Sequence, residues 1–342
     1  MIQHGHTVLV ENEAGAGAGF TTDEYRAAGC EIINAPAEIF ARAGIIVKVK
    51  EPQLGEIAML REGQILFTYL HLAASRPLTE GLLATGCMAI AYETVEVNHR
   101  LPLLEPMSEI AGSMAAMVGG YHLARHQGGR GVLMSGVPGV LPAKVVVIGG
   151  GTVGVNAARM ATGMGADVTI LEVDVERMRY LEVTMHTAYT LYSSQVSLLE
   201  LLPRVDLVIG AVLVPGARAP KLITRDMLKR MPEGSVLVDI AVDQGGCAET
   251  TRPTTHGAPT YVEEGVIHYC VANMPGAYAR TATQALTNVT HRYLMLLADH
   301  GLEEAGRLKP ELLSGINCHR GQLTCRPVAE AHALPFSALT GF

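Results

Sequence analysis

Four polar residues follow apolar runs typical of buried strands, at positions where their side chains could do chemistry. Lys50 follows Ile-Ile-Val-Lys-Val, and His71 follows Ile-Leu-Phe-Thr-Tyr-Leu. Asp243 closes Val-Leu-Val-Asp-Ile-Ala-Val, and Asn273 closes His-Tyr-Cys-Val-Ala. Ligands of open α/β sheets bind beyond the carboxyl ends of the strands. A lysine there can hold a carboxylate or polarise a carbonyl, a histidine can transfer a proton, and an aspartate can position water or a developing ammonium.

Each of these residues also has a purely structural explanation. Lys48 and Lys50 share one face of a strand, so at least one is expected to be a solvated charge. His71 can be a capping or core histidine, Asp243 a cap before a Gly-Gly pair, and Asn273 a turn residue before Met-Pro. The joint placement of the four at strand ends, and no single residue, favours a functional site.

A second group of candidates lies in residues 145–172, VVVIGGGTVGVNAARMATGMGADVTILE. The order of strand, glycine turn, helix, strand and acid is the one that a dinucleotide-binding βαβ unit requires. Gly149 is expected to make the tight turn, Gly151 to let backbone amides approach a pyrophosphate, and Gly154 to let helix and strand pack closely. Glu172 is placed to bind ribose hydroxyls and would repel a 2′-phosphate, which favours NAD over NADP. The two groups together suit an oxidoreductase whose substrate domain closes on a nicotinamide domain.

Alternating strand and helix patterns are expected to position both groups. Strands are predicted at 6–11, 45–50, 64–70, 88–92, 145–148, 168–171, 206–212, 235–242 and 266–271. Shorter helices are predicted at 21–28, 57–61, 79–83 and 224–230. One long helix is expected from an N-cap at Ser108 to about Gln127, and another from about Arg280 to His300, ending at Gly301. This alternation predicts parallel sheets with helices on both faces.

The predicted fold class is therefore α/β, with two doubly wound, Rossmann-like parallel-sheet domains, a cleft between them and two long helices joining them. The 342 residues suit two domains. The substrate domain is predicted to comprise 1–103 and 280–342, and the NAD-binding domain 104–279.

Composition narrows the class of protein further. Residues are 49% hydrophobic and 17% charged, which indicates a globular protein with much buried surface. The net charge of −7 argues against nucleic acid as a partner. No apolar run approaches the ~20 residues of a membrane span, and no signal peptide is recognisable, so a cytoplasmic location is expected. The six cysteines form no Cys-x-x-Cys pair and are expected to be reduced and mostly buried. Cys318, His319 and Cys325 make a poor metal site, and no metal is predicted.

Ten stretches carry a resemblance to a known family. They are VKVKEP (47–52), GQILFTYLHLAASR (63–76), AYETV (91–95), LPLLEPMSEIAG (101–112), GGRGVLMSGVPGV (128–140), VVVIGGGTVGVNAAR (145–159), DLVIGAVLVPGARAPKLIT (206–224), VLVDIAVDQGGC (236–247), RPTTH (252–256) and YCVANMPGA (269–277). With these stretches the chain resembles the alanine dehydrogenases, a family related to the NAD-binding subunit of proton-translocating transhydrogenase. The resemblance implies oxidative deamination of L-alanine with NAD to pyruvate, ammonia and NADH, the reverse amination, and a homohexamer.

The resemblance also implies roles for individual residues. Lys50 would bind the substrate carboxylate or carbonyl, His71 would be the general acid and base, and Asp243 would act through water and the carbinolamine. Further positions fall where the family contacts NAD: Ser108, Thr152, Val153, Glu172, Arg177, Ser193, Val212, Leu213, Ile240, Ala241, Val242, Asp243, Arg252, Val271, Ala272, Asn273 and Met274.

The sequence departs from the family pattern at three points. It begins after the usual first strand, the arginine-bearing loop that holds the substrate carboxylate, and a helix. Glu172 stands where aspartate is usual, and residues 181–191 and the tail from 308 match poorly. The first departure raises the alternative of a catalytically impaired NAD(H)-binding oligomer. A third hypothesis, the soluble nucleotide subunit of a transhydrogenase, is disfavoured by the lack of membrane segments and by the substrate-site stretches.

Overall fold

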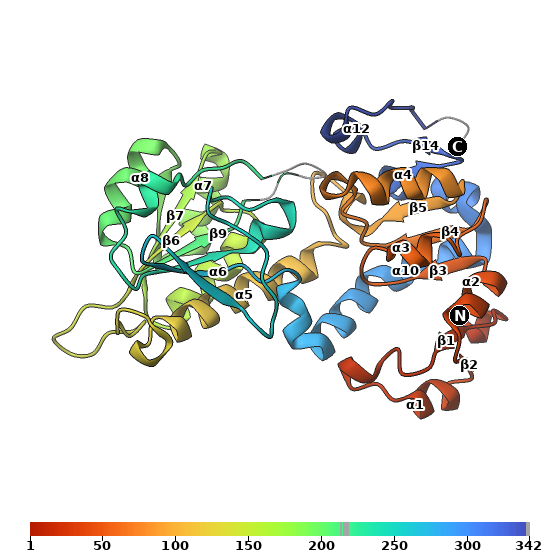
Figure 1. Ribbon diagram of the computed structural model, residues 1–342, viewed down its shortest axis with the longest axis horizontal. Coiled ribbons are helices and arrows are strands. Elements are labelled where there is room, and N and C mark those ends of the chain that lie inside the picture. The colour runs from red at the N-terminus through yellow and green to blue at the C-terminus, as the bar shows by residue number, and fades with distance from the viewer. Residues whose placement is uncertain (213, 215–218, 340–342) are drawn as a thin grey trace. The chain divides into compact units, whose positions relative to one another are not determined.

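A computed structural model describes residues 1–212, 214 and 219–339 of the chain. These residues divide into two compact units (Figure 1). Unit 1 comprises residues 1–106 and 278–339, and unit 2 comprises residues 107–212, 214 and 219–277. Each unit combines parallel strands with helices around its own hydrophobic core, which confirms the predicted α/β fold class.

The described part of unit 2 contains a seven-stranded sheet in the order β11-β12-β10-β9-β6-β7-β8. Its strands are β6 (Lys144–Ile148), β7 (Asp167–Glu172), β8 (Ala188–Tyr192), β9 (Leu207–Gly210), β10 (Val236–Asp239), β11 (Thr260–Glu263) and β12 (Val266–Tyr269). All neighbours pair in parallel except β11, which is antiparallel to β12. Successive residues of β6 alternate between two hydrophobic clusters, as expected of a strand buried on both faces: Val145 and Val147 in one cluster, Val146 and Ile148 in the other.

Helices cover both faces of this sheet. Residues of α5 (Glu105–His122) and α6 (Thr152–Gly163) join the cluster of Val145, whereas α8 (Gln195–Leu201) and α9 (Arg225–Leu228) join that of Val146. The remaining elements are α7 (Val175–Thr184) and the short 3-10 turns η5 (Arg125–Gln127), η6 (Leu202–Arg204), η7 (Ile240–Gln244) and η8 (Met274–Tyr278). Unit 2 is thus doubly wound, as predicted.

Several predicted boundaries in unit 2 are wrong, two of them at candidate site residues. Helix α5 begins at Glu105, so Ser108 is a buried residue of its first turn and not its N-cap. An acid and a proline, Glu105 and Pro106, are both favoured in a first helical turn and start the helix three residues earlier. The strand predicted at 235–242 ends at Asp239, because this side chain accepts a hydrogen bond from the backbone N–H of Ala241 and starts η7.

The described part of unit 1 contains a five-stranded sheet and a separate pair of strands. The sheet has the order β14-β13-β5-β4-β3, with β3 (Ile45–Val47), β4 (Ile65–Thr68), β5 (Met88–Ala91), β13 (Ile316–His319) and β14 (Gln322–Leu323). Strands β3 to β5 are parallel, but β13 runs antiparallel to β5 and β14. The sheet is therefore mixed, and its antiparallel strands come from a segment to which the sequence analysis assigned no element.

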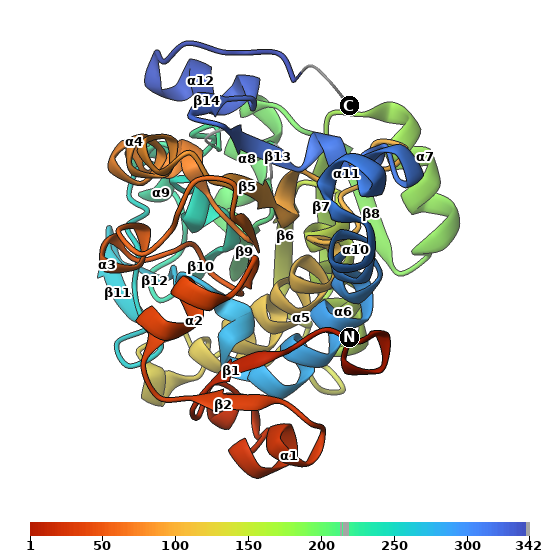
Figure 2. The same ribbon diagram turned by 90° about the vertical axis from the view of Figure 1, so that its right-hand side faces the viewer.

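The helices of unit 1 pack on this sheet and on the strand pair. The pair consists of β1 (Leu9–Glu11) and β2 (Glu31–Ile33), and α1 (Thr22–Ala27) and α2 (Pro36–Arg42) lie against it (Figure 2). The others are α3 (Leu54–Ile57), α4 (Arg76–Thr85), α10 (Ala279–Leu308), α11 (Glu311–Ser314), α12 (Arg326–His332), η1 (Ile2–His4), η2 (Ala16–Ala18), η3 (Leu72–Ala74) and η4 (Tyr92–Thr94). Gly301 interrupts α10 with non-helical angles, as predicted, but the chain becomes helical again beyond it.

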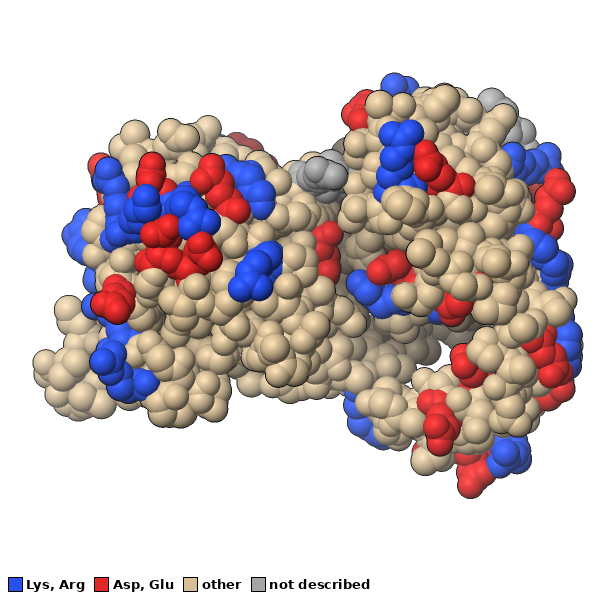
Figure 3. Space-filling model, viewed as in Figure 1, with Lys and Arg blue, Asp and Glu red and all other residues tan. Residues whose placement is uncertain are grey.

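The surface carries charges of both signs. Figure 3 shows acidic and basic side chains interspersed on the face in view, in place of a patch of one sign. Within the described ranges, no helix is long and apolar enough to cross a membrane, and no three His, Cys, Asp or Glu side chains are grouped to hold a metal ion. The six cysteines all lie in those ranges and are free thiols, five of them buried, as the sequence predicted.

Candidate active site

The glycine turn of unit 2 connects β6 to α6 and is shaped by steric contacts. Gly149 has a φ of 104°, which side-chain-bearing residues rarely adopt, and a Cβ there would lie 2.8 Å from the carbonyl oxygen of Ala211. A Cβ on Gly154 would lie 1.8 Å from the carbonyl oxygen of Gly149, so only glycine lets α6 approach the turn. A Cβ on Gly151, by contrast, would meet no described atom within 4 Å. The space beside Gly151, the N-cap of α6, is therefore open to a ligand.

Three predicted cofactor residues surround this turn. The Glu172 carboxylate accepts hydrogen bonds from the backbone N–H of Gly150 at 2.7 Å and of Val173 at 2.7 Å. Arg177 Nε donates to the Gly150 carbonyl oxygen at 2.7 Å, so both backbone polar groups of Gly150 are held by side chains. The backbone N–H of Ser193 donates to the Glu172 carbonyl oxygen at 2.8 Å. Oε1 also accepts a hydrogen bond from the backbone N–H of Asp174 at 3.1 Å, whereas Oε2 accepts that of Gly150. A carboxylate oxygen can accept two hydrogen bonds, so Oε2 keeps capacity for a ribose hydroxyl.

Asp243 and Asn273 also lie together in unit 2, although neither ends a strand as predicted. Asp243 lies in η7, four residues beyond β10, and Asn273 lies four residues beyond β12. The backbone N–H of Asn273, which has a φ of 57°, donates to Asp243 Oδ2 at 3.3 Å. The parallel pairing of β10 with β12 explains the meeting, because it carries both following turns to the same edge of the sheet.

Asp239, which was not among the predicted site residues, shapes the Asp243 turn. Asp239 is fully buried, and its Oδ2 accepts hydrogen bonds from the Cys247 backbone N–H at 2.8 Å and from Thr251 Oγ1 at 2.5 Å. These bonds tie the segment that follows η7 to the last residue of β10. The available signal was an acid inside an otherwise apolar run, Val-Leu-Val-Asp-Ile, which implies a hydrogen-bonded buried carboxylate.

The remaining predicted cofactor residues lie in several elements of unit 2. They are Ser108 in α5, Thr152 and Val153 in α6, Val212 after β9, Ile240, Ala241 and Val242 in η7, Val271 and Ala272 after β12, and Met274 in η8. Leu213 lies outside the described residues. Contact of these residues with NAD stays a prediction.

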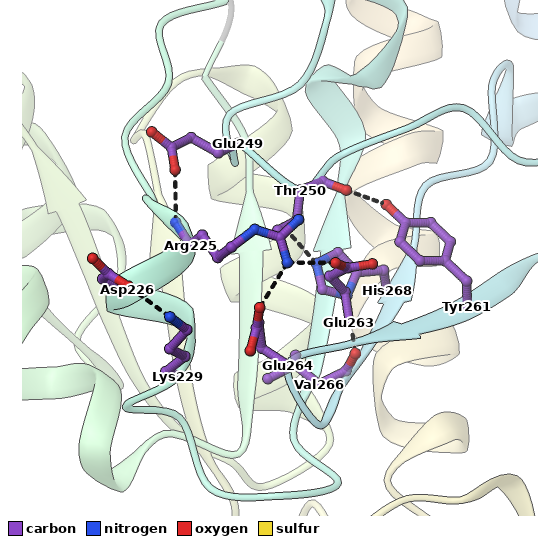
Figure 4. A network of polar contacts seen from close by, with 10 residues as sticks. All are labelled: Arg225, Asp226, Lys229, Glu249, Thr250, Tyr261, Glu263, Glu264, Val266 and His268. Carbon is purple, nitrogen blue, oxygen red and sulfur yellow. Dashed lines mark hydrogen bonds and ion pairs between the residues drawn. The ribbon is translucent and has the colours of Figure 1, made fainter.

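Arg252 is supported by the hairpin of β11 and β12. Its guanidinium lies 3.9 Å above the ring of Tyr261, whose hydroxyl donates to the Thr250 carbonyl oxygen. Figure 4 shows how the hairpin is held: Arg225 of α9 pairs with Glu263 and Glu264 in its turn. Burial raises the pKa of Tyr261, so its hydroxyl stays protonated and able to donate.

In unit 1, the residues that follow β3 and β4 meet around a carboxylate. His71 Nδ1 lies 3.1 Å from Glu51 Oε2, and Lys50 Nζ lies 3.6 Å from the same oxygen. Because β3 and β4 are parallel neighbours, their following segments reach the same edge of the sheet. Lys48, the residue after β3, forms an ion pair with Glu56, so the two lysines have different carboxylate partners.

A second carboxylate holds the backbone of His71. Glu93, in η4 after β5, accepts hydrogen bonds from the backbone N–H groups of His71 at 2.7 Å and Leu70 at 3.0 Å. These bonds accompany a left-handed backbone at His71, with a φ of 49°, which is uncommon for a residue with a side chain. Together, Lys50, Glu51, His71 and Glu93 form what we call the Glu51 cluster.

The charges of the Glu51 cluster set its protonation states. Burial by itself would raise the pKa of Glu51, but the hydrogen bond with His71 and the charge of Lys50 lower it to about 2. Glu51 is therefore an ionised acceptor at neutral pH. The sequence analysis did not select Glu51 or Glu93, although each lies beside or within a stretch that it had marked, directly after Lys50 and in the segment after β5.

The glycine turn, its helix and the terminal acid Glu172 define a dinucleotide-binding α/β protein, whose other unit holds a histidine between two carboxylates. Two family models match the chain: "Alanine dehydrogenase/PNT, N-terminal domain" over residues 1–111 and "Alanine dehydrogenase/PNT, C-terminal domain" over residues 115–326. The chain belongs to the alanine dehydrogenase/PNT family.

Individual relatives agree with this assignment. The chain is 54% identical to an alanine dehydrogenase of Halomonas elongata, over 98% of this chain and 91% of that protein. It is 51% identical to an alanine dehydrogenase of Mycobacterium tuberculosis, with the same coverage. A solved structure titled L-alanine dehydrogenase superposes with a TM-score of 0.89 at 48% identity, over 97% of this chain and 92% of that chain. A transhydrogenase structure from Sinorhizobium meliloti, at 24% identity and a TM-score of 0.79 over 94% of this chain and 92% of that one, shares the fold.

Proposed function

We propose that this chain is an NAD-dependent alanine dehydrogenase. It would catalyse the reversible reaction of L-alanine, NAD⁺ and water to pyruvate, ammonium, NADH and a proton. The observation that carries the proposal is the identity of about half the residues with alanine dehydrogenases, which extends through both units. The Glu51 cluster and the glycine turn supply the two kinds of group that such a reaction needs, proton-transfer residues and a dinucleotide site.

Residues 104–279, which include unit 2, are proposed as the NAD-binding domain, and the rest of the chain as the substrate domain. The open backbone at Gly151 fits a pyrophosphate, and the first turn of α6 offers amide N–H groups to it. Glu172 would accept hydrogen bonds from the ribose hydroxyls and would exclude a 2′-phosphate by charge, so NAD is the proposed cofactor. Arg252, fixed over Tyr261, is proposed as a further cofactor contact.

The chain's own residues would bind the substrate and move its protons. Bound NAD⁺ would supply the acceptor for the hydride that leaves Cα of alanine. Lys50 would hold the substrate carboxylate or carbonyl, and His71 would accept the proton that the alanine ammonium must lose before oxidation. Once the amine has become an imine, Asp243 would position the water that attacks its carbon. His71 would then exchange protons as the carbinolamine releases ammonium and leaves pyruvate.

We extend the proposal to a homohexamer and to a cytoplasmic location. The hexamer rests on the family resemblance, and the location on the pattern of apolar residues in the sequence. Analytical ultracentrifugation of the purified chain would test the assembly, and a predominant species smaller than a hexamer would contradict it.

The proposed activity can be tested with purified protein, NAD⁺ and L-alanine at alkaline pH, where loss of a proton from the amine favours deamination. We expect NADH absorbance to rise only when the amino acid is present, with glycine and L-serine as comparison substrates. A protein that binds NADH but forms none with alanine would contradict the proposal and favour an NAD(H)-binding role.

A further inference from the structure

Glu51 lies between the two residues proposed to act on the substrate. One of its oxygens, Oε2, is 3.1 Å from His71 Nδ1 and 3.6 Å from Lys50 Nζ. All three side chains are only partly exposed, with Glu51 at 29% and His71 at 25%. The carboxylate therefore bridges the proposed proton-transfer residue and the proposed substrate-binding cation.

The contact with Glu51 determines which nitrogen of His71 carries the proton. An ionised carboxylate only accepts hydrogen bonds, so the Nδ1 atom that faces it must be the donor. When the imidazole is neutral, its single N–H is then on Nδ1 and its lone pair is on Nε2. Loss of the carboxylate would let the ring rotate and let the proton occupy either nitrogen.

We infer that Glu51 is a positioning residue for His71, holding the imidazole by its Nδ1–H so that Nε2 is the atom that exchanges protons with the substrate. The inference rests on the proposed function. It adds a named residue and a named atom to the proton transfer, and it assigns Glu51 an effect on catalysis through His71.

Other contacts hold the rest of His71 and allow the role of Glu51 to be isolated. Glu93 fixes the backbone through two N–H groups, and the Tyr69 ring stacks on the imidazole with centroids 5.9 Å apart. The Tyr69 hydroxyl in turn donates to the Leu103 carbonyl oxygen at 2.6 Å. Removing the charge of Glu51 therefore changes the orientation and charge state of the imidazole more than the path of the backbone.

Glu51 must also affect the proton affinity of His71. Protonated His71 lowers the pKa of Glu51, and the coupling is reciprocal, so ionised Glu51 favours the imidazolium. Lys50, 3.6 Å from the same carboxylate, opposes a positive charge on His71. Of the other titratable groups, Tyr69 is neutral because burial raises its pKa, and the Glu93 carboxylate faces the His71 backbone. Removing the Glu51 charge should therefore lower the pKa of His71.

The test compares the full-length wild-type protein with Glu51→Gln and with a matched control, Glu56→Gln. Glu56 is also a partly buried acid in an ion pair with a lysine, Lys48, and its other oxygen accepts a hydrogen bond from the Gln53 backbone N–H at the start of α3. We expect kcat for alanine deamination to fall about 10- to 100-fold in Glu51→Gln. In the plot of kcat against pH, we expect the limb that reflects protonation of His71 to move to lower pH. Glu56→Gln should stay within about 2-fold of wild type, with the limb in place.

Three outcomes would overturn the inference while the wild type remains active. One is an unchanged kcat and pH profile in Glu51→Gln. Another is a loss confined to KM for pyruvate, which would mean that Glu51 acts through Lys50. The third is an equal loss in Glu56→Gln, which would indicate a general structural effect. An inactive wild type would instead contradict the proposed function, so the two failures are distinguishable.

A second variant covers the case in which Glu51→Gln folds poorly. Glu51→Asp keeps the charge and withdraws the carboxylate by one methylene, which lengthens its contact with Nδ1. A lower kcat at an unchanged melting temperature would support the positioning role. Full activity of Glu51→Asp together with failure of Glu51→Gln to fold would show that the carboxylate serves the fold, and would overturn the inference.

Discussion

The glycine turn of unit 2 and the Glu51 cluster of unit 1 are held together in different ways. The glycine turn consists of residues 149–154, and its shape follows from positive φ and from the absence of a Cβ at Gly154. The Glu51 cluster brings together side chains that follow three strands, and ionic hydrogen bonds hold them. The turn should therefore be sensitive to volume and indifferent to pH, whereas the cluster should be sensitive to charge.

The largest expected effect comes from adding one methyl group to the glycine turn. In Gly154→Ala the new Cβ would lie 1.8 Å from the Gly149 carbonyl oxygen, so α6 must move away from β6. We expect a loss of about 3 kcal/mol or more in the free energy of unfolding and loss of NADH binding. Gly163→Ala, in the same helix, is the control, because its Cβ meets no described atom within 4 Å. Urea unfolding and NADH fluorescence titration measure both, and a Gly154→Ala protein equal to wild type would disprove the steric account.

The second-largest effect is expected from a substitution in the Glu51 cluster, which should leave the glycine turn intact. His71→Ala removes the proposed proton-transfer group, so kcat with alanine should fall about 10²- to 10⁴-fold. The dissociation constant for NADH should stay unchanged, because the substitution lies in unit 1. His291→Ala, at an exposed position of α10, is the control. Retained turnover in His71→Ala would remove His71 from the mechanism.

The third substitution tests whether the charge of Glu172 contributes to cofactor binding at the glycine turn. Glu172→Gln keeps an acceptor oxygen for the Gly150 N–H but removes the charge. We expect NADH affinity to weaken by about 10-fold, and the preference for NADH over NADPH to shrink by at least as much. Titrations of each protein with NADH and with NADPH measure the ratio of the two dissociation constants. An unchanged ratio would mean that Glu172 supports the turn without selecting the cofactor.

The smallest effect is the contribution of the cluster to stability as a function of pH. The pKa of Glu51 is lowered from 4.5 to about 2 in the folded chain, so its contacts stabilise the fold fully above pH 4.5 and are lost as the pH falls towards 2. Wild type should exceed Glu51→Gln by about 1 to 2 kcal/mol near neutral pH, a difference of no more than about 4 °C in melting temperature. This difference should narrow on acidification. A gap that is constant with pH would contradict the ionic account of the cluster.

The glycine turn is formed by contiguous residues and the Glu51 cluster by residues distant in sequence. This difference also explains which parts of the molecule could be predicted from the sequence. The unit β6-α6-β7 was predicted closely, because strand, glycine turn and helix are encoded in contiguous residues. Strand β13 was missed, because it pairs with β5 across more than 200 residues and no local pattern marks that partner. The antiparallel hairpin of β11 and the edge strand β8 were missed as well.

The residues of the candidate site also differ in whether a local sequence pattern marks them. Lys50, His71, Asp243 and Asn273 were selected by their position after apolar runs, and the structure brings Lys50 near His71 and Asp243 near Asn273. Whether these two pairs act on one substrate stays a prediction. The acids Glu51, Glu93 and Asp239 were not selected, because their importance lies in hydrogen bonds to residues distant in sequence.

Following the hydride from L-alanine to the cofactor decides whether the chain is an alanine dehydrogenase. The wild-type protein is mixed with NAD⁺ and L-alanine that carries deuterium at Cα, and the reduced cofactor is analysed by mass spectrometry. If the chain is an alanine dehydrogenase, NADH should contain one deuterium for each pyruvate formed. Pyruvate formed without deuterium in NADH, or no alanine-dependent NADH from protein that binds the cofactor, would contradict the claim.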